Sequence, residues 1–296
     1  MRQLIAVILT AIILAPAAFA ENPQAIDQLK SGARTDANAA WWPYVPEDAT
    51  DAIQAAIDSG AKAVVIPYVG RPWIVRPIRL RGNLELTFEP GVVVLAKEGE
   101  FRGKGDSLFT ASDATDITIR GYGATLRMRK KDYQNPPYEK AEWRMGLDFT
   151  GCERIRVEGL RIESTGGDGI YIGATKNKPY CKDVVIRDVT CHDNHRQGIS
   201  VITAENLLIE NCTLTGTGGT APEAGIDFEP NNSNERLVNC VMRNCYVEGN
   251  AGDGILLYLR PLSKETQPVS IVVENCLIRG GGHAGIAVGA VDDDAP

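Results

Sequence analysis

A Gly-Ile pair recurs five times in the second half of the chain, at residues 169–170, 198–199, 225–226, 254–255 and 285–286. The successive spacings are 29, 27, 29 and 31 residues. An internal period of this length is typical of solenoid proteins, in which each repeat buries its apolar face only by stacking on its neighbours. This repeat constrains the fold more than any other feature of the sequence.

Four positions upstream of each Gly-Ile pair are apolar or cysteine in all five repeats. Short apolar stretches punctuated by Gly, Asn and Asp carry these positions, as is typical of β-strands. The sequence therefore predicts an all-β protein, a right-handed parallel β-helix whose coils stack about 4.8 Å apart. A leucine-rich repeat is the competing solenoid, but its Leu-x-x-Leu-x-Leu pattern is not kept. The columns expected to face inward are Ile155, Val184, Leu207, Cys240 and Ile271; Val157, Ile186, Ile209, Met242 and Val273; Leu160, Val189, Cys212, Cys245 and Cys276; and Ile162, Cys191, Leu214, Val247 and Ile278.

One clear helical pattern lies at residues 51–59, where Ile53 and Ile57 share a face and Asp48 or Thr50 can cap the N-terminus. We expect this helix to close the N-terminal end of a β-helix domain, because the first coil of a solenoid otherwise exposes an unpaired edge.

The domain boundaries follow from these patterns. The β-helix domain is expected to span residues 48–296, and the polar residues 21–47 are expected to be a linker or a loosely held arm. Beyond the last Gly-Ile pair, either Asp292–Asp294 protect the final coil by their charge or the sequence is part of a longer chain.

Residues 1–20 have the pattern of a secretory signal peptide. Arg2 is followed by a nearly continuous apolar stretch at residues 4–14 and by a small-x-small cleavage site at Ala18-Phe19-Ala20. The protein is therefore expected to be secreted or periplasmic.

Charge and hydropathy exclude two classes of partner. The formal net charge is −7, with 31 basic and 38 acidic residues, which argues against nucleic acid because neutralising phosphates needs a basic surface. No run of 18 apolar residues follows residue 20, so no membrane span is expected. The sequence does not indicate an oligomeric state.

All seven cysteines fall at positions expected to face inward. Cys212, Cys245 and Cys276 would stack in one column, and three stacked residues cannot all pair. We therefore expect reduced, structural cysteines that behave as small buried hydrophobes, with Cys152 and Cys181 as the pair to check for a disulfide. Inward cysteines also argue against a zinc site.

Three segments together resemble the pectate-lyase-like right-handed β-helix superfamily, nearest the polygalacturonase-type glycoside hydrolases. They are DATDAIQAAIDSGAKAVVIP at residues 48–67, SDATDITIRGYGATL at residues 112–126 and GGDGIYIG at residues 166–173. The resemblance covers about residues 48–290. It implies a β-helix that cleaves glycosidic bonds by hydrolysis or β-elimination; relatives include alginate C5-epimerases and non-enzymatic surface proteins.

The polygalacturonase motifs transfer poorly. Their order is Asn-Thr-Asp, Asp-Asp, Gly-His-Gly and Arg-Ile-Lys, and here only Asp168 matches one of the first two. Gln197 stands where the next acid is expected, and His283 lies four coils after Asp168, roughly 19 Å away at the coil spacing. The resemblance therefore implies the fold but not the pectinase mechanism.

Asp227 and Glu229, in AGIDFEPN, are expected to point outward from one strand. Their Cα atoms would lie about 6.5–7 Å apart. Inverting glycosidases hold their carboxyl groups about 6.5–9.5 Å apart, and two nearby carboxyls split their pKa values into one acid and one base. A solvated pair, or acids that accept hydrogen bonds from a turn, is the competing interpretation.

Other polar residues are predicted to lie near this pair. Asp168 and His195 are expected to tune or position it, and Arg196 to bind a substrate carboxylate, since Arg matches that group bidentately. Tyr171 and Tyr258 are expected to stack on sugar rings. No cofactor is required, but Asp168, Asp227 and Glu229, with Glu223, carry oxygen ligands suited to calcium.

The sequence thus predicts an exported enzyme that degrades a polysaccharide by hydrolysis with paired carboxylates. One alternative is a polysaccharide lyase or C5-epimerase acting on a uronate polymer, with His195 as base and Arg196 on the uronate. Another, of a different class, is a non-catalytic glycan-binding or cell-surface β-helix protein.

Overall fold

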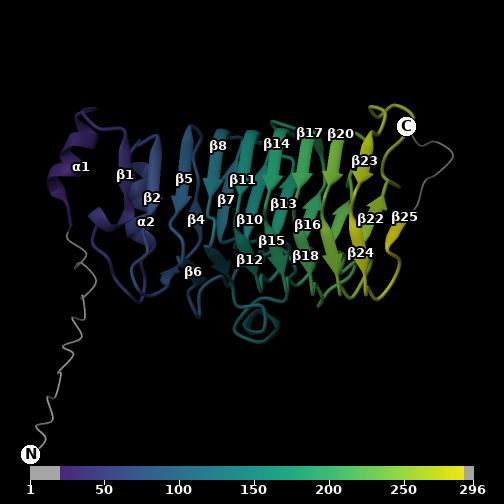
Figure 1. Cartoon of the computed structure of the whole chain (residues 1–296), viewed down its shortest axis with the longest axis horizontal. Coiled ribbons are helices and arrows are strands. Elements are labelled where there is room, and N and C mark those ends of the chain that lie inside the picture. The colour runs from purple at the N-terminus through teal and green to yellow at the C-terminus, as the bar shows by residue number, and fades with distance from the viewer. Residues whose placement is uncertain (1–20, 290–296) are drawn as a thin grey trace, which may run out of the picture.

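The structure, a computed structural model, describes residues 21–289. The predicted signal peptide and Asp292–Asp294 lie outside the described residues. Within residues 21–289 the chain winds into a right-handed parallel β-helix in which each complete coil contributes one strand to each of three sheets of nine, eight and eight strands (Figure 1).

The strands of each sheet follow one another along the helix axis. Sheet A contains β1 (Asp36–Asn38), β2 (Ala63–Ile66), β5 (Leu84–Phe88), β8 (Thr115–Arg120), β11 (Glu153–Glu158), β14 (Cys181–Arg187), β17 (Ala204–Glu210), β20 (Leu237–Arg243) and β23 (Ile271–Glu274). Sheet B contains β3 (Trp73–Val75), β6 (Val93–Ala96), β9 (Thr125–Arg127), β12 (Arg161–Glu163), β15 (Thr190–His192), β18 (Thr213–Thr215), β21 (Tyr246–Glu248) and β24 (Leu277–Arg279). Sheet C contains β4 (Ile78–Arg79), β7 (Phe109–Ser112), β10 (Leu147–Thr150), β13 (Ile170–Gly173), β16 (Ile199–Val201), β19 (Ile226–Phe228), β22 (Ile255–Tyr258) and β25 (Ile286–Gly289). Two α-helices, α1 (Pro23–Lys30) and α2 (Thr50–Asp58), and two short 3₁₀ helices, η1 (Ala39–Trp41) and η2 (Asp132–Gln134), complete the described elements.

The predicted register is confirmed. Val157 pairs with Ile186, Ile186 with Ile209 and Ile209 with Met242 along sheet A. The Gly-Ile isoleucines pair in the same way along sheet C, from Ile170 to Ile286. Every predicted inward residue before the last coil is buried, so like side chains stack on like in one continuous core.

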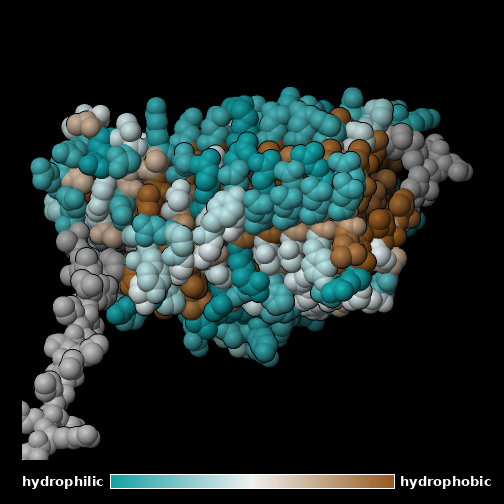
Figure 2. All heavy atoms as spheres, in the orientation of Figure 1, coloured by the Kyte–Doolittle hydropathy of each residue, from teal (hydrophilic) through white to brown (hydrophobic). Residues whose placement is uncertain are grey.

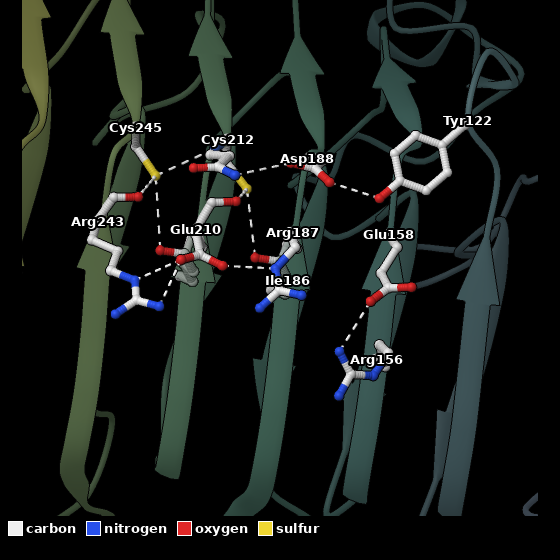
Figure 3. Close-up of polar contacts among 12 residues, drawn as sticks. Tyr122, Arg156, Glu158, Ile186, Arg187, Asp188, Glu210, Cys212, Arg243 and Cys245 are labelled. Atoms are coloured by element: carbon white, nitrogen blue, oxygen red, sulfur yellow. Dashed lines mark hydrogen bonds and ion pairs between the residues drawn. The ribbon is translucent and has the colours of Figure 1, made fainter.

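Alternating charges run along the outer face of sheet A. Glu210 on β17 accepts from Arg187 Nε on the preceding strand at 2.7 Å and from Arg243 Nε on the following strand at 2.7 Å (Figure 3). Opposite charges thus face each other across adjacent strands, and a slip of one residue would place them out of reach.

The cysteines are free, as the column argument predicts. Cys212 and Cys245 lie side by side where adjacent strands of sheet A end (Figure 3), and the Cys212 amide donates to Cys245 Sγ at 3.4 Å. Cys152 and Cys181 also stand in adjacent coils without a disulfide, and the Cys152 amide donates to Cys181 Sγ at 3.3 Å. Burial raises the pKa of the Cys240 thiol to about 12, which keeps it unreactive.

The N-terminal end is closed by more than the predicted helix. Helix α2 forms where expected, and Asp48 Oδ1 accepts from the Thr50 amide at 3.2 Å. The expectation of a loose arm at residues 21–47 does not match the structure, because α1 lies there and β1 pairs with β2. The Asn22 side chain caps α1, and Pro23 follows at its first position, a start signal that the sequence carried.

The last described coil, at the opposite end, exposes apolar side chains. Figure 2 shows hydrophilic residues over much of the visible face and hydrophobic residues gathered near the C-terminal end. Val272, Leu277, Ile286 and Val288, on β23, β24 and β25, are the exposed large hydrophobic residues of that end.

Candidate functional site

The outward face of sheet C holds two copies of one short acidic motif. Leu147-Asp148-Phe149 on β10 and Ile226-Asp227-Phe228 on β19 each follow a glycine and alternate apolar and acidic residues. Pairing along the sheet places Asp148, Tyr171, Ser200 and Asp227 in one outward column. Asp148 is a candidate that the sequence reasoning missed, although Gly146-Leu147 resembles the Gly-Ile pair and signals one more coil.

Arg196 is the centre of an acidic cluster. Its Nη2 lies 2.8 Å from Glu229 Oε2, and its Nη1 lies 3.8 Å from Asp168 Oδ2 and 4.0 Å from Asp227 Oδ2. Glu142 Oε1 lies 3.8 Å from Arg196 Nε. The structure thus brings together four of the predicted site residues from three adjacent coils: Arg196 and the three acids around its guanidinium, Asp168, Asp227 and Glu229.

Two acids of this cluster are completely buried. Asp168 and Asp227 are both 0% exposed, and neither oxygen of Asp168 has a hydrogen-bond partner. Burial raises the pKa of Asp168 to about 7, against the opposing effect of Arg196. Burial, with the neighbouring Glu229 and Asp168, raises the pKa of Asp227 well above its ordinary value. Both groups are therefore able to hold a proton near neutral pH.

Gln197 positions Asp227. Its Nε2 donates to Asp227 Oδ2 at 2.7 Å, and its Oε1 accepts from the Ala224 amide at 2.7 Å. Gln197 stands immediately before a Gly-Ile pair, at the same place in its coil as Asp168. The residue that breaks the polygalacturonase pattern is thus a neutral donor that fixes a buried carboxyl group.

A pocket of about 270 Å³ opens beside this cluster. Asp148, Tyr171, Arg196 and Glu229 supply its polar walls, and Trp143, Met145 and Ile202 supply apolar ones. Burial raises the pKa of Asp148 to about 6, partly offset by a hydrogen bond from Ser107. Asp227 and Asp168 do not line this pocket, so the two acids that face it are Asp148 and Glu229.

The segment 129–146 forms one wall of the pocket, and contacts of its basic side chains hold it in place. Arg144 is fully buried and donates to the backbone oxygens of Phe101 and Glu139 at 2.8 and 2.7 Å. Lys130 Nζ binds Asp193 Oδ1 at 2.7 Å. These contacts hold Trp143, which remains 48% exposed, at the mouth of the pocket.

Tyr171 occupies space left by a glycine. A Cβ added to Gly173 would lie 2.4 Å from the ring of Tyr171. The ring therefore packs against Gly173 and leaves no room there for a larger side chain. Burial raises the pKa of Tyr171, and its side chain lines the pocket.

Other predicted residues lie elsewhere. His195 Nε2 faces Thr220 Oγ1 at 2.8 Å and Nδ1 faces Gln134 at 3.5 Å, and neither the pocket nor the Arg196 ion pairs include it. Burial lowers the pKa of His195. Tyr258 does not line the pocket. Glu223 accepts from the Gly219 amide at 2.6 Å and so stabilises a turn.

The acids do not fit a calcium site. Arg196 already stands between Asp168, Asp227 and Glu229, and a bound cation would have to replace its guanidinium. Within residues 21–289 no group of three or more His, Cys, Asp or Glu side chains is arranged to hold a metal ion.

A larger groove, of about 960 Å³, runs along the outer face of sheet A. Val185, Leu208, Val241, Arg156 and Arg243 are among the residues that line it. It lies on a different sheet from the acidic cluster and carries no convergent set of buried acids. No helix among the described residues is long and apolar enough to cross a membrane.

The fold and the site together define a parallel β-helix with an acid-lined pocket on the outer face of one sheet. The sequence model of the family described as "Right handed beta helix region" matches residues 104–239 and 140–293. The chain belongs to this right-handed β-helix family, which confirms the resemblance to the pectate-lyase-like superfamily in fold.

Comparison with individual proteins extends this assignment. The uncharacterized protein YclG of Bacillus subtilis is 27% identical over 187 residues, which are 59% of this chain and 32% of YclG. The chain thus spans about a third of the length of that relative. The pre-mature gene product 12 of bacteriophage phi29 superposes with a TM-score of 0.60 at 19% identity, over 89% of this chain and 34% of that one. The family 28 exopolygalacturonase of Yersinia enterocolitica superposes with a TM-score of 0.56 at 14% identity, over 84% of this chain and 57% of that one.

Proposed function

We propose that this chain is an exported enzyme that cleaves a polysaccharide by hydrolysis at the pocket beside Arg196. The observation that carries the proposal is that two carboxyl groups, an arginine and two aromatic side chains line one pocket on the outside of the β-helix. The β-helix neighbours that are glycoside hydrolases, such as the exopolygalacturonase of Yersinia enterocolitica, support a glycan substrate.

Asp148 is the proposed general acid. It faces the pocket, and its pKa of about 6 leaves it protonated in mildly acidic solution. It would donate its proton to the glycosidic oxygen as the bond to the anomeric carbon breaks.

Glu229 is the proposed general base. It faces the same pocket and is held by Arg196 at 2.8 Å, so it is available to take a proton from a water molecule. That water would attack the anomeric carbon, and the products are a new reducing end and a free hydroxyl group.

The strands that carry the two acids lie farther apart than the carboxyl groups of either class of glycosidase. Strands β10 and β19 lie three coils apart, roughly 14 Å at the coil spacing. Retaining enzymes hold their carboxyl groups about 5–5.5 Å apart and inverting enzymes about 6.5–9.5 Å apart, so both side chains would have to reach along the sheet toward one glycosidic bond. Asp227, which the sequence paired with Glu229, is buried behind Arg196 and would act by holding that side chain.

The test is a screen of neutral and acidic polysaccharides, followed by new reducing ends and by absorbance near 235 nm, about where unsaturated uronates absorb. Hydrolysis predicts reducing ends without the absorbance, and elimination predicts both. Asp148→Asn and Glu229→Gln should each lower turnover about 10²–10⁴-fold with the melting temperature nearly unchanged.

Glu205→Gln is the matched control. Glu205 is 22% exposed and paired with Arg236, while Glu229 is 23% exposed and paired with Arg196. Full activity in both pocket variants would contradict the proposal. If no polymer is cleaved but some are bound, the non-catalytic glycan-binding function replaces it.

A further inference from the structure

We propose that the pocket accepts a sugar unit without a carboxylate or sulfate group, and that Glu229 excludes acidic sugars by neutralising Arg196. This inference rests on the proposed function, because it names the substrate class of the same pocket. It departs from the sequence-based expectation that Arg196 binds a uronate.

The charge of the pocket walls disfavours an anionic sugar. Among the described residues that line it, Arg196 is the single cation, and Asp148 and Glu229 are acids. The ion pair between Arg196 and Glu229 at 2.8 Å cancels the positive charge. A carboxylate that enters would lose its water and find no uncompensated cation, which is unfavourable.

Protonation of the acids around Arg196 does not reverse this charge balance. If Asp168 and Asp227 both hold protons, Glu229 alone still neutralises Arg196. Every further ionisation, of Asp148, Asp168 or Glu142, makes the surroundings more negative. The pocket is therefore neutral or negative at any pH at which Glu229 is charged.

The pocket walls are also suited to binding the hydroxyl and C–H groups of a sugar ring. Trp143, Tyr171 and Ile202 present apolar faces on which a sugar ring can stack. Thr150 and Asn231, which also line the pocket, supply neutral polar groups for sugar hydroxyl groups. These are the contacts that an uncharged ring uses.

The experiment measures binding in the Asp148→Asn background, so that no ligand is consumed. The uncharged probes are cello-, xylo- and galacto-oligosaccharides, and the acidic probes are oligogalacturonate and sulfated carrageenan oligosaccharides of matched length. Titration calorimetry at pH 5.5, with Trp143 fluorescence as a second readout, should show binding of at least one uncharged probe and none of the acidic ones.

Glu229→Gln in that background should reverse the exclusion. Freeing Arg196 should raise affinity for oligogalacturonate about 10-fold or more, the usual strength of a charge-assisted hydrogen bond. Because Asp168 holds its proton at pH 5.5, adding Asp168→Asn should leave this gain nearly unchanged. Glu205→Gln, which removes an equally exposed acid from sheet A, should leave the affinity unchanged.

Each outcome bears on the inference. Tightest binding of an acidic probe, or an unchanged oligogalacturonate affinity in Glu229→Gln, overturns the inference. Hydrolysis of a uronate polymer by the unmodified protein overturns it as well, while the proposed hydrolytic function stands. If an uncharged probe binds through Trp143 but no polymer is cleaved, the inference about the substrate class is supported and the proposed hydrolytic function is contradicted.

Discussion

Replacing Asp168 by Asn should change how the stability of the fold depends on pH. Asp168 is completely buried, and its pKa is about 7 in the folded protein, compared with about 3.9 in an unfolded chain. The folded protein therefore holds this proton over about three pH units in which the unfolded chain has lost it. The resulting stabilisation is fully present below about pH 4 and is lost as the pH rises to about 7.

The magnitude follows from the shift. About three pH units at about 1.4 kcal/mol each give roughly 4 kcal/mol. At about 2–4 °C per kcal/mol for a protein of this size, the melting temperature should move by about 8–16 °C. Since Asn has the shape of a protonated Asp, Asp168→Asn should match the unmodified protein at pH 4.5 and exceed it at pH 7.5.

Thermal unfolding followed by circular dichroism at pH 4.5, 5.5, 6.5 and 7.5 checks this expectation. Asp253→Asn is the control, because Asp253 also precedes a Gly-Ile pair but is only half-buried and accepts from the Ala284 amide at 2.9 Å. Its difference from the unmodified protein should stay nearly constant with pH. A constant difference for Asp168→Asn as well would refute the reasoning and show that Arg196 keeps Asp168 ionised.

Three further outcomes are expected. Ile209→Asp should prevent folding, measured as loss of soluble, cooperatively melting protein, because an unpaired charge in a fully buried column costs several kcal/mol; a soluble, cooperative variant would contradict the register. Titration of thiols in denaturant without reductant should find at least five of the seven cysteines free, since all seven are unpaired in the structure; three disulfides would contradict this. Gly173→Ala should displace the Tyr171 ring, which a new Cβ would approach to 2.4 Å, and weaken sugar binding while the melting temperature changes little; unaltered affinity would mean that the ring does not bind sugar.

The sequence by itself determined the β-helix and its register. The Gly-Ile period and the apolar columns are local features of each coil, and coils stack at one fixed spacing, so residues at the same column position of successive coils must meet. Ile186, Ile209 and Met242 therefore lie where the pattern placed them. The free cysteines follow from the same columns, because a stack of three cannot pair completely.

The tertiary structure alone decided which outward residues meet and which remain covered. The period showed that Asp227 points away from the coil interior, but not that Arg196 and Gln197 would bury it. His195 and Arg196 are neighbours in sequence, yet one faces Thr220 and the other the acids, since a turn sends successive side chains in different directions. Trp143 lies at the pocket on a segment that does not belong to the repeat. The course of that segment depends on the buried hydrogen bonds of Arg144, which the Gly-Ile period does not predict.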